Sequence, residues 1–207
     1  MSKPLTIITP TYDYPRFKSV VQRAIASIFA QEQHDFEVRH IIVFDGEVNN
    51  GFCVENQPPW YRLEVYGTPV TRVWGIAQRN FGMSLVQDGW VWFFDHDNVF
   101  YPNAFAVVSD ALEVDTGVLI TRARHLHANE KLFGKSTDMV IPVDLDHAPR
   151  YTDIDSINFI VHSSLIGFGE WQEKWGHDFL FVQNMAAFAR ASDMQIKRKD
   201  CIVGEHS

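Results

Sequence analysis

Short apolar segments alternate with segments of helical periodicity along the first half of the chain. Residues 5–9, 41–44 and 90–94 are apolar and rich in β-branched or aromatic side chains, which is typical of buried strands. Residues 17–28 and 76–86 instead place apolar side chains three or four positions apart, as in a helix that buries one face. Strands that alternate with helices predict a parallel sheet with helices on both faces, so we expect an α/β fold.

The rest of the chain extends this pattern less regularly. Pro10 is expected to end the first strand, and Pro102 to occupy the first position of a helix. Residues 125–150 are polar and contain glycine and proline, so we expect a long loop there. The remaining predicted elements are a turn at residues 11–15, strands at residues 62–66, 118–121, 158–166 and 201–203, and helices at residues 102–112 and 178–191.

Polar side chains follow three of the predicted strands, at the point where each strand ends. Thr11 and Tyr12 follow the first strand, Asp45 follows the second, and Asp95 and Asp97 follow the third. An open α/β sheet binds its ligands at the carboxyl ends of its strands. The sequence therefore predicts that these residues converge on one binding site.

The sequence Asp95-His96-Asp97 directly follows a buried strand. Alternation along an extended stretch would aim both carboxylates to one side, where two hard oxygen ligands suit Mg²⁺ or Mn²⁺ with substrate phosphates completing the coordination. A solvated turn capped by Asp is the alternative. Two further Asp-x-Asp pairs, at residues 144–146 and 153–155, lie in polar surroundings and are expected outside the site.

Other single residues allow a functional and a structural interpretation. Asp45 could accept hydrogen bonds from a base edge or ribose hydroxyls, or could form a turn with Gly46. Tyr12 could stack on a nucleobase or pack at the rim, and Arg79 could bind a diphosphate or form a surface salt bridge. Asp178, at a predicted helix start, could be a general base or a helix N-cap.

Composition and cysteine content narrow the class of protein. The 207 residues carry 18 Lys and Arg against 26 Asp and Glu, a net charge of −8, which disfavours general binding to nucleic acid. Cys53 and Cys201 lack the spacing of a metal or redox pair; two unpaired buried thiols are expected, with one disulfide as the alternative. His125 and His127 lack the further nearby ligands that zinc requires. Without a signal peptide or a long apolar run, we expect a cytoplasmic protein with no stable membrane insertion.

Eight stretches, in order, resemble the family 2 glycosyltransferases of GT-A fold. They are Thr6-Ile-Ile-Thr-Pro-Thr-Tyr12, Ile42-Val-Phe-Asp-Gly46, Gly75-Ile-Ala-Gln-Arg-Asn-Phe-Gly82, Trp92-Phe-Phe-Asp-His-Asp-Asn98, Pro102-Asn-Ala-Phe105, the strand at residues 158–167, Gly176-His-Asp-Phe179 and the residues from Cys201 to His206. The chain departs from the family pattern at Gln78, where Ala is usual, and at His177, where Glu is usual.

The resemblance implies a fold, a domain organisation and a reaction. The fold would be a Rossmann-like, mostly parallel central sheet with helices on both faces, in a single domain over residues 1–207. Residues 1–112 would bind the nucleotide-sugar, and residues 113–207 would bind the acceptor. The enzyme would move a sugar from a nucleotide-diphosphate sugar, a UDP-sugar by expectation, to an acceptor hydroxyl with inversion at the anomeric carbon.

The same resemblance implies the roles of particular residues. Asp178 would be the catalytic base, and Asp95, Asp97 and His206 would bind Mn²⁺ or Mg²⁺. The contacts to the nucleotide-sugar would come from Pro10, Thr11, Tyr12, Asp45, Arg79, Asp95 and His96. The acceptor stays open between a glycan, a lipid-linked sugar, a small molecule and a modified nucleic acid.

Two other functions are compatible with this topology. A nucleotidyltransferase that makes sugar nucleotides would have a Gly-rich, basic first loop, and residues 9–15 are neither. A catalytically inactive nucleotide- or glycan-binding module would not require Asp95, Asp97 and Asp178, all of which are present.

Overall fold

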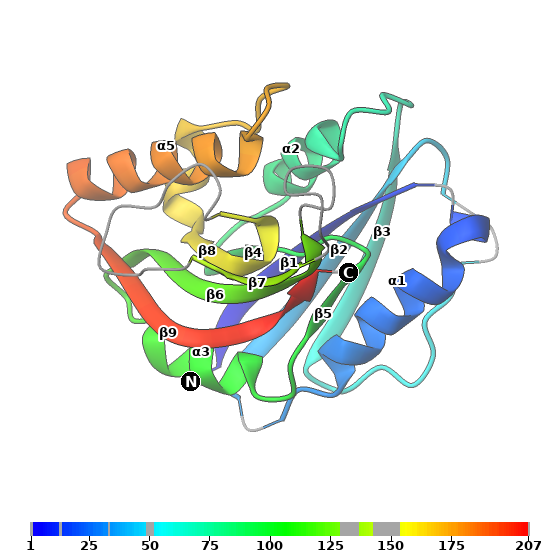
Figure 1. The fold of residues 1–207 in the computed structure, drawn as a ribbon, viewed down its shortest axis with the longest axis horizontal. Helices are drawn as coiled ribbons and strands as arrows, with labels where there is room; N and C mark the ends of the chain where they lie inside the picture. Colours follow the sequence, from blue (N-terminus) through cyan, green and yellow to red (C-terminus); the bar gives the residue numbers. More distant parts are fainter. Residues whose placement is uncertain are drawn as a thin grey trace.

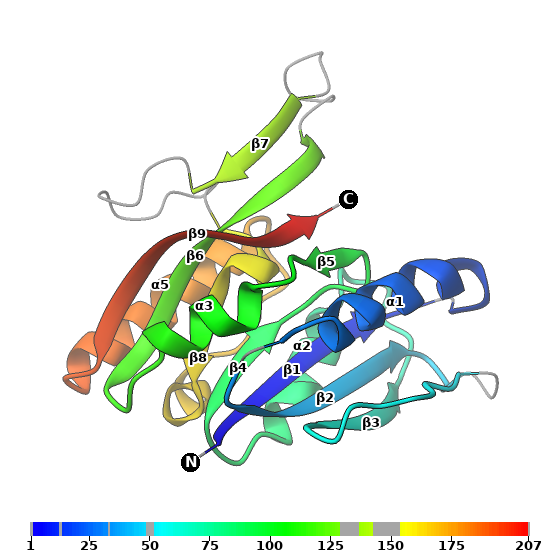
Figure 2. The ribbon, with the colours of Figure 1, turned by 90° about the horizontal axis from the view of Figure 1, so that it is seen from below.

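A nine-stranded sheet forms the centre of the molecule, and helices cover both of its faces (Figure 1 and Figure 2). The computed structural model describes residues 2–12, 14–32, 34–48, 52–128, 137–142 and 154–206. The strand order is β3-β2-β1-β4-β8-β6-β9-β5, with β7 paired to β6. The α/β fold predicted from the sequence is therefore confirmed.

The elements run in the following order along the chain. The strands are β1 (Lys3–Thr11), β2 (Phe36–Asp45), β3 (Tyr61–Thr68), β4 (Trp90–Phe93), β5 (Asn98–Phe100), β6 (Thr116–Ala128), β7 (Thr137–Ile141), β8 (Phe159–His162) and β9 (Gln195–His206). The helices are α1 (Tyr14–Phe29), α2 (Ile76–Ser84), α3 (Ala104–Ala111) and α5 (His177–Ala191), with short 3₁₀ segments η1 (Ser156–Asn158) and η2 (Ser163–Phe168).

The two halves of the sheet differ in strand direction. Strand β1 pairs in parallel with both β2 and β4, and β2 pairs in parallel with β3. Strand β8 is antiparallel to its neighbours β4 and β6, whereas β9 is parallel to β6. Because β1, β2 and β4 are parallel, their carboxyl ends meet at one edge of the sheet, as the sequence predicts.

Alternating side chains of the central strands build a core on each face of the sheet. Ile7 and Trp92 belong to the cluster that packs under α1 and α3. Their neighbours Ile8 and Phe93 belong to the cluster that packs under α2 and α5. Since both faces are covered, β4 is apolar throughout, and β1 is buried from Leu5 to Thr11 with threonine as its buried polar residue type.

Two proline predictions are wrong. Pro10 lies within β1, which continues to Thr11. Beyond Ile8, β1 is paired with β2 alone, so a residue that lacks an N–H is tolerated there. Pro102 precedes α3, which begins at Ala104 after Asn103.

The predicted loop at residues 125–150 is partly strand. Strand β6 continues to Ala128 and pairs with β7 in an antiparallel hairpin. Figure 2 shows this hairpin extending away from the body of the molecule. The five residues of β7 are too few to show a hydrophobic period, and the glycine and prolines around them favoured the loop interpretation.

The last strand is much longer than the predicted strand at residues 201–203. Strand β9 spans Gln195–His206 and pairs with both β6 and β5. Its first half carries exposed charged side chains, such as Lys199 and Asp200, which hide the strand pattern. His206 therefore lies in a strand that is paired on both sides.

The strand after η1, the two cysteines and the helices each bear on a prediction from the sequence. The segment at residues 158–166 contains only the short strand β8, followed by η2. Cys53 and Cys201 are unpaired, as predicted, but Cys53 is exposed and Cys201 is only partly buried. In the described part of the chain, no helix combines the length and the apolar character needed to cross a bilayer.

Gly82 allows α2 to approach β1 closely, and its replacement tests this packing. A Cβ at residue 82 would lie 2.6 Å from Cγ2 of Ile8. We expect Gly82→Ala to lower the free energy of unfolding by about 1–3 kcal/mol, measured by urea denaturation. Gly167→Ala is the matched control, because no atom lies within 4 Å of its added Cβ. If Gly82→Ala and Gly167→Ala are equally stable, the close approach does not limit the fold.

Candidate active site

A cleft of about 540 Å³ opens at the edge where the carboxyl ends of β1, β2 and β4 meet. All ten predicted site residues line this cleft: Pro10, Thr11, Tyr12, Asp45, Arg79, Asp95, His96, Asp97, Asp178 and His206. Further lining residues, not predicted, are Arg72, Trp74, Gly75, Asp155 and His177. The predicted convergence is thus observed, whereas the role of each residue stays a prediction.

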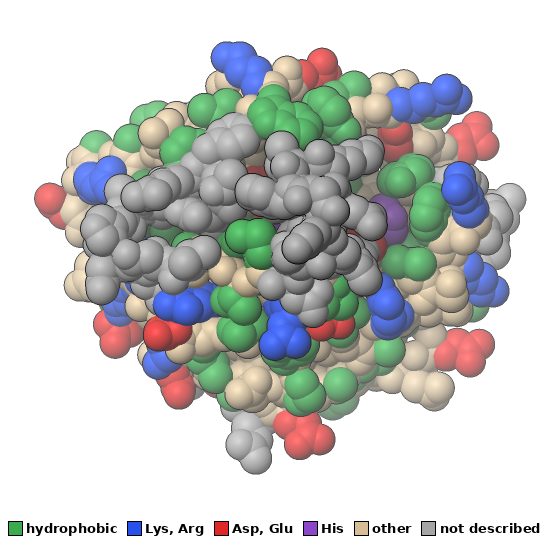
Figure 3. Space-filling model, viewed as in Figure 1, with side chains coloured by type: hydrophobic (Ala, Val, Ile, Leu, Met, Phe, Trp, Pro, Cys, Tyr) green, Lys and Arg blue, Asp and Glu red, His purple; other side chains and the backbone are tan. Residues whose placement is uncertain are grey.

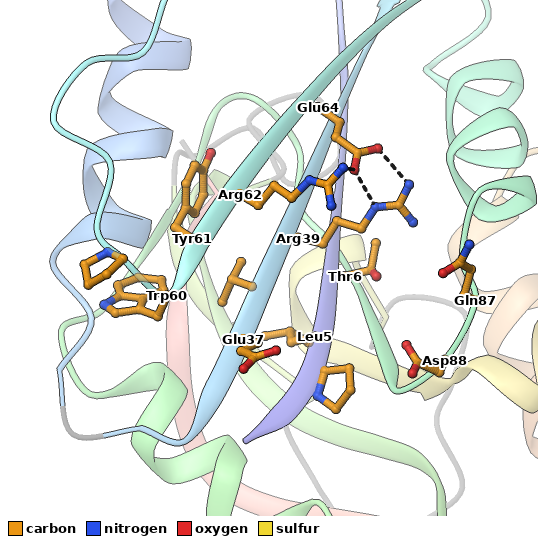
Figure 4. A pocket seen from close by; sticks show the side chains of 13 residues that line it. Leu5, Thr6, Glu37, Arg39, Trp60, Tyr61, Arg62, Glu64, Gln87 and Asp88 are labelled. Atoms are coloured by element: carbon orange, nitrogen blue, oxygen red, sulfur yellow. Dashed lines mark hydrogen bonds and ion pairs between the residues drawn. The ribbon is translucent and has the colours of Figure 1, made fainter. Parts of the chain in front are cut away.

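A second cavity, of about 440 Å³, lies at the opposite ends of the parallel strands (Figure 4). Its principal charged groups already satisfy each other, because Arg39 donates to both carboxylate oxygens of Glu64 at 3.0 and 2.7 Å. Arg62 adds a second cation at 3.2 Å from the same carboxylate. This arrangement braces β2 against β3 and leaves little unsatisfied chemistry for a ligand.

Arg79 and Asp95 form a buried ion pair in the floor of the cleft. Only 4% of the Arg79 side chain is exposed, so the alternative of a surface salt bridge is wrong. One guanidinium nitrogen donates to Oδ1 of Asp95, the other donates to the carbonyl of Trp74 at 2.6 Å, and the group lies 4.6 Å from the ring centroid of Trp171. Burial opposes ionisation of Asp95, but Arg79 holds its pKa below the usual value.

Asp97 and His206 are two further ionisable side chains of the cleft, and the pKa of each is shifted. Burial and the nearby Asp95 carboxylate raise the pKa of Asp97. Burial opposes protonation of His206, but the carboxylates around it, led by Asp155 and Asp97, raise its pKa. Nδ1 of His206 donates to Oδ1 of Asn98 at 3.0 Å, which leaves Nε2 as the atom that could ligate a cation.

The donor types of this cleft fit a divalent cation. Asp97, Asp155 and His206 line this cleft together, and the surrounding carboxylates, led by Asp155 and Asp97, raise the pKa of His206. Among the described residues, no three His, Cys, Asp or Glu side chains lie close enough to hold a metal by themselves. Mg²⁺ and related ions commonly use one or two protein ligands together with substrate phosphates, so two ligands suffice.

Asp155 is the site residue that sequence reasoning placed wrongly. It was expected in polar surroundings outside the site, but it lines the cleft. Asp155 is the N-cap of η1, where it accepts a hydrogen bond from the backbone N–H of Ile157. The neighbouring Ser156 donates to Oδ2 of Asp95 at 2.9 Å. The Asp-x-x-Asn capping pattern before an apolar strand was the available signal. Asp144, Asp146 and Asp153 lie outside the described residues.

His125 supports the same region from β6. Its ring is nearly parallel to that of His206, with centroids 5.1 Å apart, and its Nε2 lies 3.4 Å from Oδ2 of Asp155. The side chain of His127 lies outside the described residues. Within the described ranges no group able to hold a metal includes His125, so a zinc site built on it gains no support.

Asp45 holds the loop that precedes α2. Its Oδ2 accepts from the backbone N–H of Arg72 at 2.7 Å, and its Oδ1 accepts from Thr71 at 2.6 Å and from Gln78 at 2.9 Å. The buried Gln78 also donates to Thr68 at 2.8 Å, which explains why an amide stands where the family pattern has Ala. One lone pair of Oδ2 remains for a further donor such as a base N–H.

Aromatic rings lie along the walls of the cleft. Tyr12 is 50% exposed and contacts Phe17 and His96 edge to face, with centroids 5.1 and 5.2 Å away. His96 is buried and its Nδ1 donates to the carbonyl of Pro10 at 3.3 Å. Tyr12 thus presents an open ring at the end of β1, a position from which it could stack on a base.

Asp178 lies in the first turn of α5 but does not cap it. The N-cap is Gly176, which has φ 75° and makes no side-chain cap, so the N-cap alternative for Asp178 is wrong. Burial, together with the Asp155 carboxylate, raises the pKa of Asp178 to about 8. Nε2 of His177 lies 3.7 Å from Oδ2 of Asp178.

The raised pKa of Asp178 predicts a pH-dependent cost to stability. Its pKa rises from 3.8 in the unfolded chain to about 8 in the fold, so the free energy of unfolding falls as pH rises between these values. We expect Asp178→Asn to be more stable than the parent chain at pH 8, by about 1–3 kcal/mol, with a difference that shrinks toward pH 4. Urea denaturation across this range measures it, and equal stability at every pH would contradict the burial of this charge.

Comparison with known proteins gives one family and several similar folds. The family model described as Glycosyl transferase family 2 matches residues 6–196. No curated protein matches the chain. A crystal structure of TarS from S. aureus superposes with a TM-score of 0.70 at 14% identity, covering 100% of this chain and 37% of TarS.

Two further structures contain nucleotide-sugars. TarS 1–349 in complex with UDP-GlcNAc gives a TM-score of 0.64 at 14% identity, covering 99% of this chain and 58% of that one. The mannosyltransferase PcManGT from Pyrobaculum calidifontis, in complex with GDP-Man and Mn²⁺, gives 0.62 at 12% identity, covering 99% and 57%. The present chain therefore spans less than two thirds of each of these proteins.

Proposed function

The chain belongs to glycosyl transferase family 2 and has the GT-A fold, and on this premise we propose that it transfers a sugar from a nucleotide-diphosphate donor to an acceptor hydroxyl. We propose further that the donor is a UDP-sugar, that the anomeric configuration inverts, and that a divalent cation is required. The observation that carries the proposal is the single cleft in which Arg79, Asp97 and Asp178 come together from different elements.

The nucleotide is proposed to bind at the ends of β1 and β2. Tyr12 offers an exposed ring face to the base, and Asp45 retains one acceptor position for a base N–H. The TarS structure holds UDP-GlcNAc and the mannosyltransferase structure holds GDP-Man, which supports a nucleotide-diphosphate sugar as the donor class. The choice of UDP rests on the family resemblance.

The charge balance of the cleft supports the need for a cation. The positive charge of Arg79 is already balanced by Asp95, so Arg79 cannot by itself neutralise a diphosphate. Asp97 and His206 would hold Mn²⁺ or Mg²⁺ together with diphosphate oxygens, and Asp95 would share the metal or lie closer to the ribose. The bound ion would stabilise the negative charge that develops on the leaving nucleoside diphosphate. The imidazole ligand favours Mn²⁺ over Mg²⁺.

Asp178 is proposed to remove the proton from the acceptor hydroxyl. It lines the same cleft from the start of α5. Its pKa of about 8 lies close to working pH, where a base combines sufficient basicity with a usable ionised fraction. A carboxylate on the acceptor side and cationic groups on the leaving-group side suit a single displacement with inversion.

The alternatives identified from the sequence receive less support. The end of β1 presents Thr11 and Tyr12 rather than a glycine-rich basic loop, which disfavours a nucleotidyltransferase. The net charge of −8 disfavours a nucleic-acid acceptor. In the described part of the face shown in Figure 3, Lys and Arg side chains lie among Asp and Glu side chains. A cytoplasmic location stays a prediction.

The role of Asp97 and His206 can be tested by nucleotide binding. We expect Mn²⁺ to strengthen UDP binding to the parent chain, and Asp97→Ala to remove this Mn²⁺ effect. His206→Ala should reduce it, by about tenfold if one ligand is lost. Calorimetric titration of UDP with and without Mn²⁺ measures both. Asp110→Ala, an exposed acid on α3, is the control that should behave as the parent. Unchanged Mn²⁺ dependence in Asp97→Ala would exclude the assignment.

The role of Asp178 can be tested by turnover. Asp178→Asn should lower the rate of UDP release from a UDP-sugar by about 10²–10⁴-fold, with UDP affinity retained. In the parent, kcat/KM should rise about tenfold per pH unit below pH 8 and level off above it, because only the ionised carboxylate accepts a proton. A panel of UDP-sugars with water as acceptor provides the assay. Parent-like turnover in Asp178→Asn would show that another group is the base.

A further inference from the structure

Trp74 presents a large apolar ring at the cleft without burying it. Its side chain lines the cleft, yet 63% of the residue is exposed. Burying an indole is favourable in free energy, so a tryptophan held at the mouth of a polar cleft indicates a surface that a ligand covers. Trp175, 77% exposed, lies close in sequence to α5 but is not a lining residue of the cleft.

The backbone fixes the position of this ring. Trp74 has φ 40° and Arg72 has φ 55°, conformations that are unfavourable for large L-residues. Two charged side chains hold the backbone of these two residues in this conformation. Asp45 accepts from the backbone N–H of Arg72 at 2.7 Å, and Arg79 donates to the carbonyl of Trp74 at 2.6 Å. The loop therefore holds Trp74 in an exposed position, and these two hydrogen bonds offset the conformational strain of the backbone.

The ring of Trp74 packs against the residue that precedes the proposed catalytic base. It lies within 12° of parallel to the imidazole of His177, with centroids 6.1 Å apart. His177 directly precedes Asp178 and approaches it to 3.7 Å. His177 is stacked against one face of the indole, so a ligand ring would have to rest on indole surface that His177 leaves open, in the cleft that Asp178 also lines.

We infer that the indole face of Trp74 is a stacking platform for a neutral pyranose ring of the acceptor; the inference rests on the proposed function. One face of a pyranose is lined by C–H groups and packs on an aromatic ring while its hydroxyls stay free to donate. The side chains of Asp155 and Asp178 line the same cleft, and their oxygen atoms can accept hydrogen bonds from such hydroxyls. Tyr12, which contacts Phe17 and His96 instead, is left for the base.

The test measures pyranoside and nucleotide binding on the same samples. Four proteins are compared: the parent chain, Trp74→Ala, Trp74→Phe and Trp175→Ala. Calorimetry measures the UDP affinity of each, and each is then saturated with UDP and Mg²⁺. Saturation-transfer NMR then detects methyl α- and β-glucopyranoside and methyl α- and β-galactopyranoside. We expect at least one pyranoside to bind through the C–H protons of one ring face. Trp74→Ala should weaken it roughly fivefold to tenfold, Trp74→Phe less, and Trp175→Ala not at all.

Three results would overturn the inference while UDP still binds. The first is unchanged pyranoside binding in Trp74→Ala. The second is a loss of UDP affinity in that variant as large as its loss of pyranoside affinity, which would make Trp74 part of the base site. The third is that none of the four pyranosides binds to the parent chain. A parent chain that fails to bind UDP in the presence of either Mg²⁺ or Mn²⁺ would instead contradict the proposed function itself.

Discussion

The buried ion pair between Arg79 and Asp95 organises the whole cleft. Arg79 reaches from α2 to the end of β4, and the same guanidinium holds the loop carbonyl of Trp74 and packs on Trp171. Asp95 in turn accepts from Ser156 of η1. Removing either charge would leave the other buried without a partner, which costs far more than the pair contributes when intact. Three elements from both halves of the chain therefore depend on one contact.

Further acidic residues, Asp97, Asp155 and Asp178, lie in the same cleft as that pair. Burial, followed by the neighbouring carboxylates, raises the pKa values of Asp97 and Asp178. Such an arrangement lowers stability in the absence of a ligand, as binding sites commonly do. In the proposed function, this concentration of acidic groups would favour a donor that binds together with a divalent cation.

Sequence reasoning succeeded where structure follows from local pattern. The apolar runs that became β1, β2 and β4 end in polar residues because strand ends define where a covered sheet opens to solvent, and Asp45, Asp95 and Asp97 lie there as predicted. It failed where position depends on distant partners. Asp155 reaches the cleft only because η1 packs beside β4, β6 and β9, and the charged outer half of β9 resembles a loop in isolation.

The pairing of β9 with β5 has a kinetic consequence. It places His206 beside Asn98, a contact between residues separated by 108 positions in the chain. Contacts of this kind must close long loops, which makes them slow to form and late in folding. A partly folded chain can therefore contain a native-like β1–β4 layer while lacking the imidazole that completes the cleft. Recovery of the proposed cation-dependent nucleotide binding during refolding should lag behind the recovery of secondary structure.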